Sequence, residues 1–501
     1  MFKFRHQEPS LPLPVPEPLA LPDVGTAAFL GPAERGPTWP QPVGSWQEFV
    51  HWFGPHVPGS CLAYVVDGYF RNGGRRCYIV RIVPADARTA TMTFSTLRVQ
   101  AVGPGNWGNR VAVRIKESGR GRFRLTVRYW RGDPPSDFIA PRPRIVPDLE
   151  ENYDHLSADP RSPDYVLKRL ERGESRLITV GWANERRRGV PRPRDFAFLR
   201  GGADGTSITV ADYEGEPYAP PEERRGLVAL RDVPEVSLVA APEGSGSLVV
   251  QAAVVAHCDT SLLFRIGLIA GPPNAKAIST VSALSDTSHA AMFFPWLEVL
   301  DPLTKSPKLV PPVGHVAGIL ARVSQQQGMR ASLEGQAIQG VLGVGTALSE
   351  AECAGLAERR VNPIRDRSAW GEQIVLGAAC TMSSNQAWRP LHARRLADAV
   401  ERAVVEGTRW VVGRPNDQGV WEALHIQIST FLSRLWRSGL LQGERAEEAY
   451  FVRCGRDTMA EDDLAEGRVI VEVGLAITAP GRFVVFRLIQ SPGGAQIVEL
   501  G

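Results

Sequence analysis

The sequence predicts a multidomain α/β (α+β) protein, with an α/β core, an inserted antiparallel β-rich domain and extended arms at both chain ends. Three observations predict this fold. A chain of 501 residues is too long for one ordinary hydrophobic core. Strand-like and helix-like patterns alternate in two blocks, which favours a largely parallel sheet covered by helices. A third stretch alternates apolar and polar residues around Gly-rich turns, which is typical of an antiparallel sheet with one solvated face.

The first 23 residues form a proline-rich arm. Prolines stand at positions 12, 14, 16 and 18, so they fall on alternate residues and remove backbone donors from one edge only of an extended chain. The residues between them, Leu11, Leu13 and Val15, keep their N–H groups on the other edge. The arm is therefore either a solvated linker or a one-sided edge strand that docks on another surface.

Residues 24–95 open the core. VGTAAFLG predicts a strand, SWQEFVHWFG a short helix with Ser45 as its N-cap, and CYIVRIV a buried strand. Residues 96–198 form the inserted β-rich domain, since LRVQAV and RFRLTVRYW alternate with period two and RGDPPSDFIAPRPRIVPD is a loop. Alternation of helix and strand resumes in residues 199–365, which we assign to an α/β domain.

Residues 366–490 form a second α/β block. GEQIVLGAACT and TRWVV predict strands, and RPLHARRLADAVERAVVEG predicts a helix between them. A long helix then begins after RPND, where Pro415 ends the preceding run and Asn416 or Asp417 can cap the helix. Arg434 and Arg437 lie off the apolar face of that helix.

Residues 491–501 form a C-terminal arm. SPGGA predicts a turn, and the short β-prone segment that follows cannot be stable alone, because its backbone groups need a partner strand. We therefore expect its members to pair with another strand: Gln496, Ile497, Val498, Glu499 and Leu500.

Composition excludes several classes of function. The formal charge of +3 is far below what clustered phosphate binding requires, so we expect no nucleic-acid partner. No apolar segment approaches the roughly 20 residues that span a bilayer, and no signal peptide is recognisable, so we expect no membrane insertion. Six scattered cysteines without a C-x-x-C pair argue against a metal site or a disulfide framework. We expect no metal and no cofactor.

Catalytic motifs are absent from the sequence. His257, Cys258 and Asp259 follow an apolar run that we predict to be a strand, and neighbours on a strand point to opposite faces, so they cannot converge without other groups. The loop around Asp204 predicts a turn, and GVLGVGTALSE lacks the third glycine and the preceding strand of a dinucleotide site. We therefore predict that the protein is not an enzyme.

Several strings together resemble the tail sheath proteins of contractile phage tails and of bacterial contractile injection systems. They occur in the order of that family and extend over nearly the whole chain. They are GTAAFLGPAERGP, VGPGNWGNR, YDHLSADPRSPDYV, LRGGADG, FFPWLEVLDP, VPPVGHVAGILARV, RVNPIRD, RWVVGRPND, WEALHIQISTFLSRLWRSGLLQG and RFVVFRLIQ. The family's usual N-terminal segment, similar to T-P-G-V-Y, has no counterpart before Val24.

The resemblance implies a structural subunit that forms six-fold rings, stacks helically around an inner tube protein and contracts. It also implies contacts with baseplate and tail-terminator proteins at the two ends. Synthesis would take place in the bacterial cytoplasm, before assembly into a phage tail or tail-like particle. By the same analogy, the core lies near the tube, both arms pair with neighbouring subunits, and Arg434 and Arg437 face the tube. Residues 199–365 would correspond to a part of the family whose fold is described as subtilisin-like, which is no evidence for a protease.

Two other functions remain open. One is a cap or adaptor at the tube end that binds the tube without polymerising. The other is an α/β-hydrolase-like enzyme centred on residues 200–365, whose activity would depend on Cys258.

Overall fold

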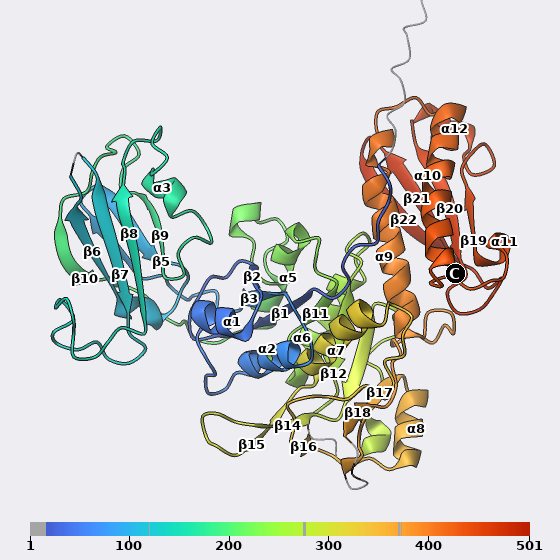
Figure 1. Cartoon of the computed structure of the whole chain (residues 1–501), viewed down its shortest axis with the longest axis horizontal. Helices are drawn as coiled ribbons and strands as arrows, with labels where there is room; N and C mark the ends of the chain where they lie inside the picture. The colour runs from blue at the N-terminus through green and yellow to red at the C-terminus, as the bar shows by residue number, and fades with distance from the viewer. Residues whose placement is uncertain (1–16, 120, 274–276, 369–370, 372, 501) are drawn as a thin grey trace, which may run out of the picture.

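The structure is a computed structural model and describes residues 17–119, 121–273, 277–368, 371 and 373–500. Three parts follow one another along the molecule (Figure 1). A β-sandwich lies at one end, a helix-covered sheet lies in the middle, and a C-terminal domain of two long helices and a four-stranded sheet lies at the other end.

The central sheet has eight strands in the order β18-β17-β13-β12-β11-β1-β3-β2. The six inner strands are parallel, and β2 and β18 are antiparallel to their neighbours at the two edges. The strands are β1 (Ala27–Gly31), β2 (Gln41–Val43), β3 (Cys77–Arg81), β11 (Leu238–Ala240), β12 (Ile266–Ala270), β13 (Ala290–Phe294), β17 (Val361–Asp366) and β18 (Ile374–Leu376). Segments 24–95 and 199–365 therefore build one sheet, with β18 added from beyond residue 366.

Helices cover both faces of this sheet because its parallel strands are apolar on both sides. Ala27 and Phe29 belong to the hydrophobic cluster under α1 (Trp46–Phe53), α2 (Leu62–Arg71) and α7 (Val313–Gln326). Ala28 and Leu30 belong to the cluster on the opposite face. That face is covered by α4 (Val210–Glu214), α5 (Gly226–Ala229), α6 (Leu248–Cys258) and α8 (Glu350–Glu358). Alternate residues of one strand thus serve two cores.

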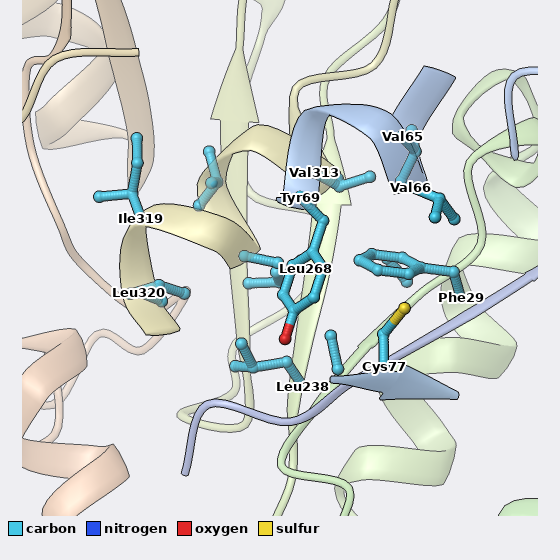
Figure 2. Close-up of a cluster of buried hydrophobic side chains, with 14 of the residues drawn as sticks. Phe29, Val65, Val66, Tyr69, Cys77, Leu238, Leu268, Val313, Ile319 and Leu320 are labelled. Carbon is cyan, nitrogen blue, oxygen red and sulfur yellow. The ribbon is translucent and has the colours of Figure 1, made fainter. Parts of the chain in front are cut away.

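Close contact between α2 and α7 depends on glycine. A Cβ atom at position 314 would lie 2.7 Å from the carbonyl carbon of Val65, and one at position 318 would lie 2.8 Å from Cβ of Asn72. Figure 2 shows the cluster beneath this contact, where Phe29 and Tyr69 meet Leu268 and its neighbours. The two helices therefore pack backbone to backbone over the sheet.

The inserted β-rich domain is a sandwich of two antiparallel sheets, β10-β6-β7-β8 and β4-β5-β9. Its strand β4 starts at Thr91, ahead of the predicted boundary at residue 96. Two chain segments connect the sandwich to the sheet and pair with each other: Arg88 with Ala203, and Thr91 with Arg200. The elements are β4 (Thr91–Phe94), β5 (Leu97–Ala101), β6 (Val111–Glu117), β7 (Phe123–Tyr129), β8 (Leu149–Leu156), α3 (Val166–Arg169), β9 (Ile178–Trp182) and β10 (Arg194–Phe198).

The C-terminal domain packs two long helices on one face of the sheet β19-β20-β21-β22. Its elements are α9 (Leu391–Gly407), α10 (Gln418–Arg437), α11 (Ala446–Ala449), β19 (Tyr450–Arg453), α12 (Glu461–Ala465), β20 (Val469–Leu475), β21 (Val484–Ser491) and β22 (Gly494–Leu500). A small sheet beside the central domain contains β14 (Leu297–Leu300), β15 (Pro307–Val310) and β16 (Gly343–Val344). Short 3-10 helices occupy Asn106–Arg110, Pro221–Glu223, Leu230–Asp232, Glu243–Gly246, Ile278–Thr280 and Arg409–Val411.

The predicted corner before α10 is confirmed, but the strand predicted before it is wrong. Asp417 caps α10 by accepting a hydrogen bond from the N–H group of Val420. TRWVV forms a 3-10 turn, because Thr408 continues the hydrogen bonding of α9 by donating to the carbonyl of Val404. The chain then turns at Gly413, which has a φ of 79°. Among the described residues, no helix is long and apolar enough to cross a membrane.

Candidate subunit-interaction site

The C-terminal strand β22 lies at the edge of its sheet. It pairs with β21 of the same chain through a two-residue turn that is closed by Ser491 and Gly494. In such a hairpin, hydrogen-bonded pairs alternate along the ladder, so positions 494, 496, 498 and 500 bond to β21. The N–H and C=O groups of Ala495, Ile497 and Glu499 point to the open edge. The predicted need for a partner strand is thus met on one side within the chain, and three residues keep unused backbone groups on the other side.

Side chains of β22 alternate in the same way. Ala495 and Ile497 pack against the core of the C-terminal domain, and Glu499 points toward α9. Val498 points outward and is 45% exposed. The five residues predicted to contact a neighbour therefore lie in one edge strand, with an exposed face and an open edge.

The N-terminal arm follows α9 and α10 where the structure describes it (Figure 1). Leu19 is buried between these helices, next to Gly407. The carbonyl of Glu17 accepts from Gln427 at 2.8 Å, and that of Leu19 accepts from Arg434 at 2.6 Å. The base of the arm is thus fixed to the C-terminal domain. The predicted contact residues Leu11, Leu13 and Val15 lie outside the described residues.

The structure places the two predicted tube-facing arginines in different roles. Both side chains are exposed in the last turn of α10. Arg434 holds the N-terminal arm, whereas Arg437 points to solvent and keeps its charge available. Within the described residues, no hydrogen bond or ion pair joins either arginine to β22.

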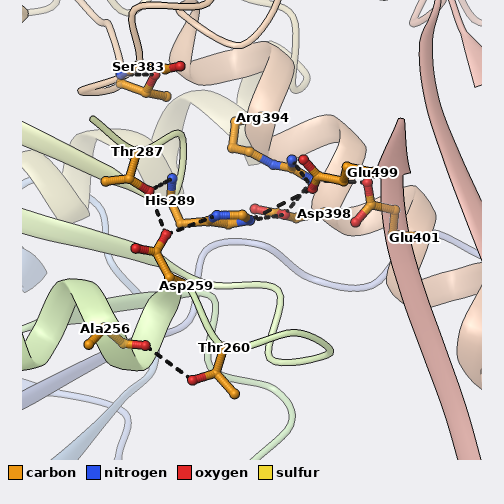
Figure 3. A network of polar contacts seen from close by, with 11 residues as sticks. Ala256, Asp259, Thr260, Thr287, His289, Ser383, Arg394, Asp398, Glu401 and Glu499 are labelled. Atoms are coloured by element: carbon orange, nitrogen blue, oxygen red, sulfur yellow. Dashed lines mark hydrogen bonds and ion pairs between the residues drawn. The ribbon is translucent and has the colours of Figure 1, made fainter. Parts of the chain in front are cut away.

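A buried ion cluster joins β22 to α9 (Figure 3). The Arg394 side chain is 0% exposed and pairs with Asp398 at 2.8 Å, with Glu401 at 3.0 Å and with Glu499 at 2.5 Å. Its guanidinium group also lies 4.1 Å from the ring centroid of Trp388. The cluster thus anchors the edge strand β22 to helix α9 in the interior of the C-terminal domain.

His289 extends the cluster to the central domain. It precedes β13, and its imidazole lies between Asp259 at 3.3 Å and Asp398 at 3.8 Å. Burial lowers the pKa of His289, but the hydrogen bond to Asp259 and the charge of Asp398 outweigh this effect and raise it. The raised pKa favours the protonated form of the imidazole between the two domains.

Sequence reasoning did not find this cluster. A signal was present, since Arg394, Asp398 and Glu401 follow the i, i+4, i+7 spacing of one helix face. Their partners Glu499 and His289 lie about a hundred residues away on either side, and no local pattern connects them.

The rival catalytic cluster does not assemble. His257 and Cys258 belong to helix α6, so the strand predicted there is wrong, and successive helical residues point in different directions. His257 lies 2.8 Å from Arg265. Burial, together with the positive charge of Arg265, lowers the pKa of His257 to about 3. Burial raises the pKa of the Cys258 thiol. Asp259 turns toward Thr287 and His289.

The usual ligand position of a parallel sheet is filled by a side chain. The order of strands reverses between β1 and β11, and ligands of open α/β sheets bind at the carboxyl ends of such strands. Here the Glu243 carboxylate accepts from Ser60 Oγ at 2.7 Å and from the N–H groups of Cys61 and Leu62 at the start of α2. Asp204 closes a turn by accepting from Asn106.

Comparison with known proteins identifies the C-terminal domain. Residues 383–491 match the family model described as phage tail sheath C-terminal domain. The tail sheath protein of Burkholderia phage BcepMu is 24% identical over 275 residues, which cover 49% of this chain and 55% of the phage protein. The match therefore spans about half the length of that relative.

Solved sheath structures are similar to the whole chain. The sheath tail protein of Listeria innocua has a TM-score of 0.63 at 13% identity and covers 94% of this chain and 96% of its own. The contracted helical sheath of the anti-feeding prophage has a TM-score of 0.58 at 19% identity, covering 96% and 97%. The contracted PVC sheath complex, from an extracellular contractile injection system, has a TM-score of 0.53 at 18% identity, covering 96% and 97%. Residues 383–491 are thus similar to the phage tail sheath C-terminal domain, and the chain as a whole has the fold of solved contractile tail sheath proteins.

Proposed function

We propose that the protein is a structural subunit of a contractile tail sheath. It polymerises as six-fold rings around an inner tube protein and contracts to drive the tube through a target envelope. The observation that carries the proposal is the match of residues 383–491 to the phage tail sheath C-terminal domain, within a chain that has the sheath fold over its whole length. Baseplate and tail-terminator proteins would meet the two ends of the polymer, and no cofactor would take part.

The open edge of β22 supports a specific contact between subunits. Its outward-pointing backbone groups at Ala495, Ile497 and Glu499 repeat with period two. In the sequence of the arm, the residues that retain an N–H group between the alternating prolines repeat with the same period: Leu11, Leu13 and Val15. An arm with prolines on one edge can pair only through the other, which suits strand addition at an edge strand. In the proposed polymer, each arm leaves its own subunit beyond Glu17 and pairs with β22 of a neighbour.

The three parts of the chain would then have different roles in the polymer. The β-sandwich would face outward, the central sheet domain would carry contacts between rings, and the C-terminal domain would lie near the tube, with Arg437 as the available cation of the predicted pair. Contraction would draw its energy from apolar surface that becomes buried between subunits. About 500 Å² of newly buried apolar surface per subunit would contribute on the order of 10 kcal/mol before costs.

Co-expression with the tube protein tests the proposal. Electron microscopy should show striated hollow cylinders, and their absence in the presence of well-formed tubes would contradict it. A cap or adaptor would decorate tube ends without forming cylinders. The hydrolase-like alternative predicts activity of the monomer that is lost in Cys258→Ala.

One residue tests the edge contact. Ala495→Pro removes a donor from the open edge of β22 and leaves the bonds to β21 intact, because the N–H of residue 495 points away from β21. Ala495→Val at the same position keeps the donor. Cylinders should be lost with proline and retained with valine; equal assembly of both variants would exclude strand addition at this edge.

A further inference from the structure

The ion cluster beneath β22 contains more acidic than basic groups. Its cations are Arg394 and the protonated form of His289 (Figure 3). The carboxylates that face them come from three elements: Asp398 and Glu401 of α9, Glu499 of β22 and Asp259 after α6. Arg395 lies next to the cluster on α9 but donates to the carbonyl of Val24, at the base of the N-terminal arm. Four carboxylates thus share one guanidinium and one imidazole.

Burial makes this imbalance costly. The side chains of Asp398 and Glu401 are 6% and 3% exposed, and the guanidinium between them is not exposed at all. Oδ1 of Asp398 lies 2.8 Å from the guanidinium of Arg394, whereas its Oδ2 has no hydrogen-bond donor among the described groups. Buried carboxylates that must share one cation are only partly compensated, which favours their protonated form.

We propose that the cluster is a proton-dependent latch on the C-terminal strand. While a carboxyl group of α9 holds a proton, Glu499 keeps Arg394 as its ion partner and β22 stays tied to α9. When that proton leaves, the negative charge of Glu401 repels that of Glu499 across the guanidinium they share, and the tie between the strand and α9 is lost.

The direction of the pH dependence follows from the acids of α9. Burial raises the pKa of Glu401 to about 8, and burial also raises the pKa of Asp398. An acid whose pKa is raised in the folded protein stabilises it at low pH, and this contribution is lost as the pH rises through the raised value. His289, whose pKa is also raised, loses its positive charge in the same direction. The latch is closed near pH 6 and open near pH 9.

The inference concerns a single chain and does not depend on polymerisation. Glu499 is one of the three residues whose backbone groups form the open edge of β22. A loosened Glu499 would therefore also disturb the edge to which the neighbouring arm is proposed to bind.

Hydrogen exchange of the purified full-length chain tests the latch. Protection factors of the β22 amides, corrected for the intrinsic effect of pH, should fall from about pH 6 to about pH 9. The expected fall is about tenfold for each unit by which the pKa of Glu401 decreases on release of the strand. Amides of β20 in the same sheet should keep their protection, which separates local release from unfolding.

Two variants make the test specific. Glu401→Gln carries a permanently neutral side chain, so its β22 should stay protected at about pH 9. Glu472→Gln is the matched control, because Glu472 pairs only with Arg487 across β20 and β21 within the described contacts, and it should keep the wild-type pH dependence. A wild-type strand with constant protection would overturn the latch. Loss of the pH dependence in His289→Gln but not in Glu401→Gln would overturn the assignment of the proton to α9.

Discussion

Replacing Arg394 by methionine tests how far the buried cluster stabilises the C-terminal domain. The change keeps most of the aliphatic stem but removes a fully buried cation with carboxylate partners at 2.5, 2.8 and 3.0 Å. Removing one partner of a buried ion pair costs about 3–5 kcal/mol, because the remaining charge stays buried without compensation. Here three carboxylates lose their cation, and they can avoid part of the cost by binding protons.

Urea unfolding followed by tryptophan fluorescence measures this cost, since Trp388 lies directly over the guanidinium. For a unit of this size, with a slope of about 1.5 kcal/mol per molar urea, a loss of about 3 kcal/mol lowers the midpoint by about 2 M. The loss should be smaller at about pH 5 than at about pH 8, because Asp398 and Glu401, whose pKa values burial raises, are more fully protonated at the lower pH.

The matched control is Arg445→Met, which breaks an exposed pair with Glu448 at 2.8 Å. This surface pair should leave the midpoint unchanged within error. Equal midpoint shifts for the two variants, or a shift for Arg394→Met that does not depend on pH, would refute the reasoning.

Three further predictions concern local contacts. Gly314→Ala should destabilise the central domain by about 1–3 kcal/mol in thermal unfolding, because the new methyl group would clash with the backbone of Val65. Gly355→Ala on α8 should be neutral or stabilising, because its Cβ would meet only the flexible end of an arginine side chain. Similar effects of the two variants would contradict this reasoning. Asp417→Ala removes the N-cap of α10 and should cost about 1 kcal/mol in urea unfolding, and an unchanged midpoint would argue against the cap. Arg434→Met should make segment 17–23 several-fold more sensitive to limited proteolysis, and wild-type resistance would show that this hydrogen bond does not hold the arm.

Local signals predicted the elements whose neighbours are close in sequence. Ser45 caps α1 by accepting from Glu48, as expected from its position before an amphipathic run, and the apolar runs at β1 and β3 form buried strands. Short runs that are apolar on all sides were ambiguous. The run before Cys258 is a helix and TRWVV is a 3-10 turn, because burial on every side suits a helix as well as a strand.

The candidate site could be predicted only in part. The sequence identified the edge residues at 496–500 and the turn before them, but not that β21 of the same chain would occupy one side. The ion cluster could not be predicted, because it depends on the packing of α9 against two segments that are distant in sequence and carry Glu499 and His289. Helix spacing alone does not distinguish a buried charged face from a solvated one.

The paired segments that connect the sandwich to the central sheet have a consequence for how such proteins diversify. The chain leaves and re-enters the sheet domain side by side, at Arg88 and Ala203. A short loop between these positions would close the remaining domain without moving β3 or β11, so the sandwich can be exchanged for a module of another size or surface. In the proposed sheath, the outward surface would thus change while the central and C-terminal domains stay the same.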